Sequence, residues 1–507
     1  MEFNQFPNIP KTNKFDNFSK EEVIQRYQVL EFELSEVIKE NYELREQKVS
    51  DEQIQLLMTE QLGSLNDTIF GRKSERYKKP IKDSEGGDSK SPPKPSVKKP
   101  SERYPNLPVR EEIISMEQAP LCPCCNEVMT DSGMKEESEQ LTVIPKKYEI
   151  VRQLRVKFRC VCQGSLITAP VPPRIIEGSA YSDEMILDVA LSKYCDLIPI
   201  ERYAAMADRS GAIDLPRNSL IATTHKFADF VSGASEQVKA GILESNVLCA
   251  DETPHRMLEG SDKKSWYLWG FSTENLCFLE CHPTRSGDVA SDILTQSKCE
   301  ILMSDVYSGY GKAIREANRL RVEAGLPLIR SVHCNAHARR YFFKTWKTHK
   351  EAEFYLDHYH EIYQLNSEAK GKPPPEVLKL RAQMKPRFEA MKKRALEELP
   401  CYPKGKYKTA LKYFLKSYDE FVLFLTDADI PIDNNGQERS LRSYVVGRKT
   451  WYGTHSERGA RTAAILFTLV ETCKLNHVNP REYLKHLVED LLAGAKPYTP
   501  VDFKKSN

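Results

Sequence analysis

The sequence lacks long apolar runs, and it has no large excess of charge of either sign. No stretch of its 507 residues approaches the roughly 18 consecutive apolar residues that a membrane-spanning helix needs. Polar residues follow Met1, without the basic segment and apolar core of a secretory signal, so we expect none. We predict a cytoplasmic protein with no membrane partner.

Basic and acidic residues are nearly balanced, with 74 Lys and Arg against 72 Asp and Glu and a net charge of +2. Bulk charge therefore does not indicate a nucleic-acid partner. Residues 71–100 nevertheless contain ten basic and four acidic residues, and residues 439–461 contain six basic and one acidic residue. Such clusters can form a phosphate-binding surface, although a solvated charge run is the commoner explanation for either one alone.

The chain is too long for a single core, and ordinary domain sizes predict a multidomain α+β protein of roughly three or four units. Residues 19–77 are expected to be helical, with a short heptad pattern made by Val23, Tyr27, Leu30, Leu34, Val37, Asn41 and Leu44. This pattern predicts a coiled coil and a homodimer or higher oligomer, and a helix packed on its own chain is the alternative. Residues 78–104, rich in Lys, Pro, Ser and Gly, are predicted to be a basic linker.

Thirteen cysteines, an odd number, argue against a framework made only of disulfides. Two close pairs stand out within residues 105–175, namely Cys122 with Cys125 and Cys160 with Cys162. Such pairs in an intracellular protein predict a structural Zn²⁺ site in a small ribbon, with strands such as 148–152. The one-residue spacing of the second pair is short for this purpose. Replacement of Cys122 by Cys124, and a metal-free ribbon, therefore remain open.

Residues 176–243 have a helical pattern. One helix is expected to open near Ile198 and to end at Gly211, and Pro216 begins a second helix. The outward-facing side chains of the second helix would include Thr223, Thr224 and Lys226. This arrangement resembles a helix-turn-helix, whose second helix enters the DNA major groove, but a plain helical hairpin explains it equally well.

Two short apolar segments each end in an aspartate, at Asp251 and at Asp305. Such segments predict strands buried on both faces, and an α/β sheet binds ligands where the carboxyl ends of its parallel strands meet. Neighbouring carboxylates repel each other unless a cation lies between them, and Mg²⁺ (or Mn²⁺) prefers such oxygen ligands. Either aspartate alone would also fit a cap of the turn that follows it.

A third carboxylate, Glu438, lies in a predicted helix start over residues 432–442, among arginines. Beside the two aspartates it would let two metal ions sit roughly 4 Å apart, an arrangement that activates a nucleophile and stabilises the leaving oxygen in phosphoryl transfer. The alternative is a capping box, in which Asn435 is the N-cap and Glu438 is its partner three residues later.

Several motifs, in order along the chain, resemble those of the insertion-sequence-66 family of bacterial transposases. They are Phe70-Gly71-Arg72-Lys73-Ser74-Glu75, Asp251-Glu252-Thr253, Ser304-Asp305-Val306-Tyr307-Ser308-Gly309-Tyr310, Cys334-Asn335-Ala336-His337-Ala338-Arg339-Arg340-Tyr341-Phe342, Asp433-Asn434-Asn435 with Glu438-Arg439, Gly447-Arg448-Lys449 with Trp451, and Ser456-Glu457-Arg458-Gly459. The resemblance implies a zipper-like start, a zinc-binding segment and a ribonuclease-H-like catalytic domain with an Asp-Asp-Glu triad at Asp251, Asp305 and Glu438. It implies DNA as the partner and makes accessory proteins of the same element plausible.

The catalytic domain is expected over residues 244–460. Its further elements are predicted as strands at 265–271 and 276–280, a helix near 290–295, the strand that ends at Asp305, and a strand at 329–333. A fourth strand beside the first would match the ribonuclease-H-like topology. Glu438 follows Asp305 by 133 residues, so the region 347–428 is predicted to be a helical insertion. Residues 461–507 are expected to form C-terminal packing helices.

The predicted activity is the cutting of insertion-sequence ends and the joining of the freed 3′ hydroxyl to target DNA, by two-metal phosphoryl transfer. Phosphate contacts are predicted for His337, Arg339, Arg340, Arg439, Arg442, Arg448, Lys449 and Arg458. Structural hydrogen bonding is the alternative for His337, and for Trp451 packing is favoured over base stacking. A metal-dependent nuclease of related fold without strand transfer, and a non-catalytic DNA-binding regulator derived from a transposase, are the alternative functions.

Overall fold

The computed structural model describes residues 99–114, 120, 123–124, 126–129, 137–144, 146–159, 166–259, 265–402 and 404–506. The chain divides into two compact units. One unit contains the described residues of 155–205 and 215–507, and the other contains those of 80–154 and 206–214. The predicted coiled coil over 19–77 and the predicted zinc ligands Cys122, Cys125, Cys160 and Cys162 lie outside the described residues, so both stay predictions.

A five-stranded sheet forms the centre of the first unit. Its strands are β3 (Val247–Arg256), β4 (Ser265–Ser272), β5 (Cys277–His282), β6 (Ile301–Ser304) and β7 (Arg330–His333). Their spatial order is β5-β4-β3-β6-β7. The pairs β5-β4 and β4-β3 are antiparallel, and β3-β6 and β6-β7 are parallel. The strands predicted around both aspartates are therefore present, and the fourth of them pairs with the first.

The two faces of this sheet belong to two different cores. Leu248 of β3 and Leu302 of β6 point into a core shared with the long helices, whereas Ile301 and Met303 of β6 point into a second core. Cys249 of β3 packs against the second core as well. The alternation follows from the two-residue period of a strand. It explains why these segments are apolar throughout, since both of their faces are covered.

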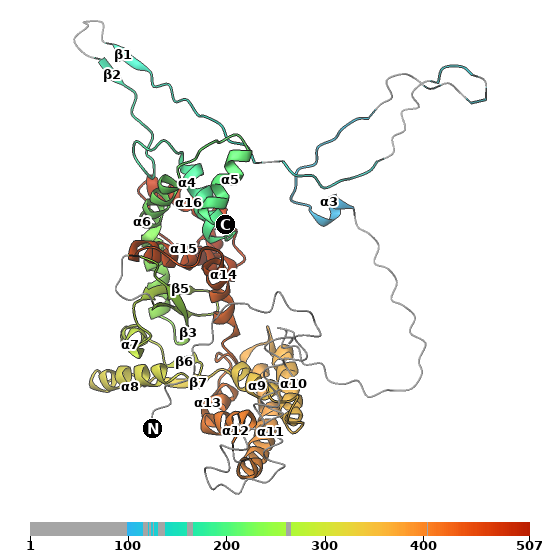
Figure 1. Ribbon diagram of the computed structural model, residues 1–507, viewed down its shortest axis with the longest axis vertical. Helices are drawn as coiled ribbons and strands as arrows, with labels where there is room; N and C mark the ends of the chain where they lie inside the picture. The colour runs from blue at the N-terminus through green and yellow to red at the C-terminus, as the bar shows by residue number, and fades with distance from the viewer. Residues whose placement is uncertain are drawn as a thin grey trace, which may run out of the picture. The chain divides into compact units, whose positions relative to one another are not determined.

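Seven of the described helices share the core on the first face of the sheet. They are α4 (Asp183–Tyr194), α6 (Arg217–Leu243), α7 (Gly287–Gln296), α8 (Ser308–Glu323), α14 (Asn435–Trp451), α15 (Glu457–Leu475) and α16 (Pro480–Leu492). The helices α6, α14 and α15 contact the strands, and α4 and α16 pack beyond α15 (Figure 1). The chain also forms α3 (Pro100–Arg103) in the second unit, α5 (Ile200–Arg209) and α17 (Pro500–Ser506). Among the described residues no helix combines the length and hydropathy that a membrane crossing requires.

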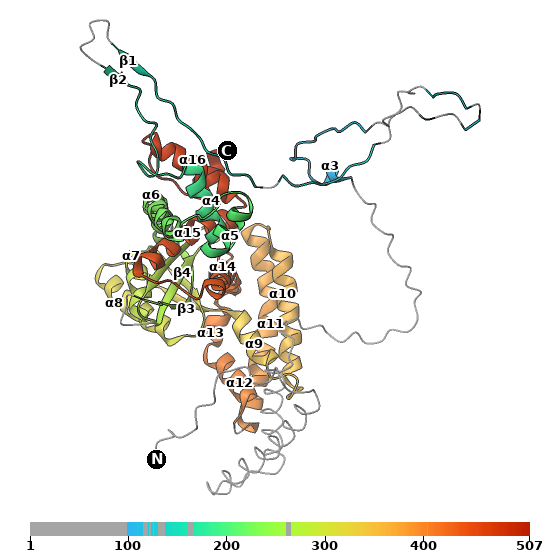
Figure 2. The same cartoon turned by 45° about the horizontal axis from the view of Figure 1, so that its top comes forward.

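The region predicted to be an insertion is helical and builds the second core. Its elements are α10 (Ala352–Ala369), α11 (Pro374–Glu398), η1 (Leu399–Cys401), α12 (Lys406–Lys416), α13 (Tyr418–Val422) and η2 (Leu423–Thr426), and they gather beside α9 (Asn335–Phe343) in Figure 2. Buried aromatic side chains fill this core, and the rings of Phe342 and Tyr355 stack at 4.1 Å. Its hydrophobic contacts include Met303 and Val332 of the sheet. The insertion therefore packs against the face of the sheet on which the two aspartates are expected.

The edge strand β5 is closed by side chains of α15. Thr472 Oγ1 accepts a hydrogen bond from the amide of Cys277 at 3.2 Å and donates to its carbonyl at 3.1 Å. One helical turn earlier, Thr468 Oγ1 accepts a hydrogen bond from the amide of Leu279 at 3.0 Å. Because an edge strand otherwise presents unpaired backbone groups, these two threonines satisfy an edge that no further strand covers.

Two local predictions are wrong. Residues 148–152 form no strand, and Ile150 is 96% exposed, because no second layer covers this segment. The ordered strands nearby are β1 (Lys157–Arg159) and β2 (Leu166–Thr168), which form a short antiparallel hairpin. Thr224 does not face outward on α6: it is buried, and its hydroxyl donates to the carbonyl of Leu220 at 2.7 Å. The helix α6 lies in the main core, and this burial leaves Thr224 unable to reach DNA bases.

Candidate active site

The register of the parallel pair β3 and β6 places the two aspartates side by side. Cys249 lies opposite Met303, and continuing the register by two residues brings Asp251 opposite Asp305. Both side chains then point to the face covered by the insertion. Asp305 also accepts the amide hydrogen of Tyr307 at 2.9 Å, so it caps the turn into α8 as well as standing beside Asp251. The two interpretations of this aspartate are compatible.

Asp251 lies in a crowded negative environment. Burial is the main cause that raises its pKa to about 8, and the charges of Glu252, Asp305 and Glu438 raise it further. A hydrogen bond from the amide of Glu252, at 2.9 Å, acts in the opposite direction. All three predicted catalytic carboxylates are therefore within electrostatic reach of one another at Asp251, although they are far apart in the sequence.

The start of α14 is fixed to the sheet beside Asp251. Asn434 precedes the helix, and its side-chain amide donates to the carbonyl of Ala250 at 2.8 Å. Asn435 is already inside the helix, and its side chain donates to Asp433 at 2.6 Å. The capping-box alternative is therefore wrong, because Asn434 and Asn435 have partners outside the helix end. The helix start serves to dock α14 on β3, one residue before Asp251.

The start of α9 joins the carboxyl end of β6 to the segment before α14. The amide of Cys334 donates to the carbonyl of Ser304 at 3.0 Å, and its sulfur accepts a hydrogen bond from the amide of Asn434 at 3.2 Å. The buried side chain of Asn335 donates to the carbonyls of Phe421 and Ile432, at 2.9 and 3.2 Å. Four distant chain segments are thus tied together next to the acids.

Glu438 turns toward α9. Its carboxylate lies 3.7 Å from His337 Nε2 and 3.6 Å from a guanidinium nitrogen of Arg340. Within the part of the chain that the structure describes, Cys334, His337 and Glu438 are the group whose potential ligand atoms lie within 4.8 Å of one another, and that group does not include the two aspartates. His337 and Arg340, predicted to contact phosphate, therefore lie at the acids, where they are also ion-pair partners of Glu438.

Glu252 is a member of this neighbourhood that sequence reasoning missed. Its side chain is nearly inaccessible and receives a hydrogen bond from Tyr310 at 2.5 Å and an ion pair from Arg285 at 2.6 Å. Burial raises the pKa of Glu252, and these two partners oppose that rise. Its position directly after Asp251 was the available signal, because a second acid within a largely covered strand needs its own cationic partner.

Three of the predicted phosphate-binding residues form an exposed stripe on α14, at Arg439, Arg442 and Lys449. Their spacing of three and seven residues puts them on one side of the helix. Arg448 lies on another side, half-buried, and donates to the hydroxyl of Thr253 at 3.3 Å. Arg339 is half-buried on α9, with its guanidinium over the ring of Phe343 at 5.8 Å.

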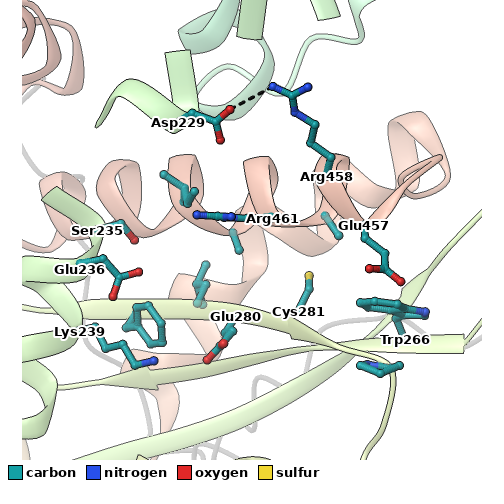
Figure 3. A pocket seen from close by; sticks show the side chains of 16 residues that line it. Asp229, Ser235, Glu236, Lys239, Trp266, Glu280, Cys281, Glu457, Arg458 and Arg461 are labelled. Carbon is teal, nitrogen blue, oxygen red and sulfur yellow. Dashed lines mark hydrogen bonds and ion pairs between the residues drawn. The ribbon is translucent and has the colours of Figure 1, made fainter. Parts of the chain in front are cut away.

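Arg458 lies apart from the acids, at the rim of a cavity of about 910 Å³ between α6, β5 and α15 (Figure 3). Its guanidinium forms an ion pair with Asp229 at 3.0 Å. No member of the predicted triad lines this cavity. Trp451 at the end of α14 packs against the core and lies 6.4 Å from the ring of Tyr194, in agreement with the packing interpretation.

The sequence matches two family models. The model described as "Transposase IS66 family" covers residues 178–462, and the model described as "IS66 C-terminal element" covers residues 468–498. Two similar proteins of Sinorhizobium fredii (strain NBRC 101917 / NGR234) carry the names "Uncharacterized protein y4hP" and "Uncharacterized protein y4qI". The first is 24% identical over 412 residues, which are 76% of this chain and 73% of that protein. The second is 26% identical over 401 residues, 76% of this chain and 72% of that protein.

Proposed function

Because the chain belongs to the IS66 transposase family, we propose that it is a DNA transposase that cuts the ends of an insertion sequence and joins the freed 3′ hydroxyl to target DNA. The observation that carries the proposal is the convergence of Asp251, Asp305 and Glu438 at one end of the sheet. The strand order β5-β4-β3-β6-β7, antiparallel on one side of β3 and parallel on the other, supports a ribonuclease-H-like fold for this domain.

The three carboxylates would hold divalent cations, Mg²⁺ or Mn²⁺. The crowding that raises the pKa of Asp251 is the condition that a bound cation relieves, so the donor set fits hard, oxygen-preferring ions. When bound, such ions neutralise charge on the scissile phosphate and make the attacking hydroxyl more nucleophilic. Asp251 and Asp305 stand on the rigid sheet, and Glu438 completes the set from α14.

The remaining residues of the site position the acids and the substrate. Asn434 holds the start of α14 on β3, which fixes the backbone of Glu438 relative to Asp251. His337 and Arg340 hold the Glu438 carboxylate in the state without DNA. In the DNA complex we expect the side chains of His337 and Arg340 to move from that carboxylate to the scissile phosphate, which frees Glu438 to turn toward the aspartates. The stripe of Arg439, Arg442 and Lys449 would then bind the phosphates of the flanking duplex.

Other parts of the proposal rest on the sequence. A coiled coil over 19–77 would pair two copies so that both element ends are held together, and Zn²⁺ at Cys122, Cys125, Cys160 and Cys162 would stabilise a small DNA-contacting module. The helices α5 and α6 are proposed as a helical hairpin, because α6 packs into the core along most of its length. Accessory proteins of the same element and target DNA are the proposed further partners.

A strand-transfer assay with a labelled element end and a target plasmid tests the function. Wild type should give joined product, and Asp305→Asn should bind the same DNA without cutting it, because the substitution removes a ligand and keeps the shape. Asp292→Asn, on the exposed side of α7, is the matched control and should remain active. Cut ends without joined product from wild type would identify a nuclease, and binding without cutting would identify a regulator. Either result would refute the transposase.

A further inference from the structure

The insertion carries a strongly basic helix, and none of the predicted site residues lies on it. Residues 404–416 contain five lysines and no Asp or Glu. On α12 the side chains of Tyr407, Ala410, Leu411 and Phe414 are buried in the core of the insertion. Lys408, Lys412 and Lys416 recur every four residues on the other side of the helix, half-buried at the first position and exposed at the other two. The helix therefore presents a row of cations away from its core.

The lysines of this row have no ion-pair partner within the part of the chain that the structure describes. Two other exposed lysines of the insertion do lie near acids: Lys385 is 3.9 Å from Glu389, and Lys372 is 4.0 Å from Glu376. A solvated lysine needs no partner, but three in a row without one leave a local excess of positive charge.

The helix α12 lies against the catalytic end of the sheet. Tyr413, next to Lys412, stacks on Tyr341 of α9 with ring centroids 4.3 Å apart. Burial raises the pKa of Tyr413, and the charge of Asp305 is the next cause, while a hydrogen bond with the backbone of Val306 opposes both. The hydroxyl of Tyr413 therefore reaches the residue that follows Asp305.

The C-terminal end of α12 is also within electrostatic reach of the sheet. His333 is the last residue of β7, and burial lowers its pKa. The charges of Glu420 and Asp305 raise that pKa, and the charge of Lys416 lowers it. Lys416 and Asp305 therefore both act on one side chain at the end of β7. The basic row runs along the insertion toward this strand, which pairs with β6.

We propose that Lys408, Lys412 and Lys416 of α12 bind the phosphate backbone of the DNA duplex whose strand enters the site, as a surface separate from the stripe on α14. Eight residues of α-helix span about 12 Å. At one phosphate per 3.4 Å of duplex axis along each strand, this length faces roughly three or four phosphates, which matches three lysines. Lysine is a point charge that binds phosphate without reading bases, so the surface positions DNA and carries no sequence preference.

This inference rests on the proposed function, because it takes DNA as the molecule that meets the acids. It adds a role for the long insertion between Asp305 and Glu438. Side chains of α12 pack in the same core as Met303 of β6, so this core fixes α12 relative to the strand that precedes Asp305. Phosphate binding by α12 would thus improve the alignment of the scissile bond as well as the affinity.

The test is the salt dependence of duplex binding by the full chain, with the triple variant Lys408→Gln, Lys412→Gln, Lys416→Gln. The slope of log affinity against log salt should become shallower by about 0.9 for each lysine that contacts a phosphate, hence by roughly 2 to 3 in total. The matched control is Lys485→Gln, Lys504→Gln, Lys505→Gln, which removes the same charge from exposed positions of α16 and α17. The control should keep the wild-type slope. Equal melting temperatures of all three proteins verify that both variants fold.

A wild-type slope in the α12 variant, or an equal loss in the control, overturns the inference. Cutting of the element end separates this inference from the proposed function. If wild type cuts DNA and the α12 variant keeps the wild-type slope, α12 is not a DNA surface and the enzyme stands. If wild type does not cut but the α12 variant alone loses slope, the surface stands and the proposed activity is wrong.

Discussion

Removal of the most crowded carboxylate should stabilise the metal-free protein while it abolishes activity. Asp251 has a folded-state pKa of about 8 against an ordinary value of 3.8, first because of burial and then because of Glu252, Asp305 and Glu438. An acid with a raised folded pKa binds its proton more tightly when folded, so the free energy of unfolding falls as pH rises from about 4 to about 8 and stays low above that range. We therefore expect Asp251→Asn to gain most above pH 8.

The size of the gain follows from the same pKa. One pKa unit corresponds to about 1.4 kcal/mol, so the charged form of Asp251 costs the folded state at most about 6 kcal/mol at high pH. Solvent and side-chain relaxation reduce this cost, and we expect Asp251→Asn to raise the free energy of unfolding by about 1 to 3 kcal/mol at pH 8.5 in EDTA. The difference should shrink to near zero at pH 4, where both proteins are neutral at this position in the folded state.

Thermal and urea unfolding measure this effect. The proteins compared are metal-free wild type, Asp251→Asn and the exposed control Asp292→Asn, each from pH 4 to pH 9. Wild type and control should lose stability in parallel as pH rises, and Asp251→Asn should lose less. Added Mg²⁺ should then raise the melting temperature of wild type and control and leave Asp251→Asn unchanged. An Asp251→Asn protein that melts below wild type at pH 8.5 without metal would show that this carboxylate is not crowded by the other acids.

Three further substitutions test how the site is supported. A Cβ on Gly270 would overlap the side chain of Gln437, so Gly270→Ala should lower the free energy of unfolding by about 1 to 3 kcal/mol and weaken catalysis. Adding Gln437→Ala should restore both stability and activity. If urea titrations show no rescue, the contact is refuted. Thr472→Val removes the partner of both backbone groups of Cys277 and should cost roughly 1 to 3 kcal/mol by the same measurement, whereas an unchanged midpoint would mean that water replaces the hydroxyl. Arg381→Met removes the hydrogen-bond donors to the carbonyls of Phe424, Asp427 and Ile430 and should lower the free energy of unfolding by roughly 3 kcal/mol or more. Amide hydrogen exchange should become faster in the segment before α14. Unchanged exchange there would show that Arg381 does not support this segment.

The framework of the sheet could be predicted because its signals are local. A short apolar run leads to each aspartate: β6 ends directly before Asp305, whereas β3 continues past Asp251 to Arg256, so the expected strand end at Asp251 is wrong. The turn at 273–275 separates two further runs that pair as expected. The presence of an insertion was also expected, since a 133-residue connection is too long for a single crossover, and this region forms helices from Ala352 to Thr426. Each of these predictions depends on the residues of a single segment and needs no knowledge of its tertiary contacts.

The features that escaped prediction depend on contacts between distant segments. Nothing near Asn435 shows that its neighbour Asn434 will donate to a carbonyl of β3, and that contact is what turns an apparent capping box into a docking point. The partners of Glu438 come from α9, roughly one hundred positions earlier. They are His337 and Arg340, which the sequence alone assigns to phosphate binding. Thr224 is buried one turn after Leu220, which packs in a small core with Val189 and Tyr203, and the local periodicity of α6 does not record these distant partners.

The hydroxyl groups that Thr468 and Thr472 extend to β5 also limit how molecules of this kind can assemble. A neighbouring copy cannot lengthen the sheet from Cys277 to Leu279, since the helix already occupies the hydrogen-bonding positions an added strand would use. Strand addition at this stretch of β5 would first require α15 to move away from the sheet, so α15 protects this edge as well as covering it.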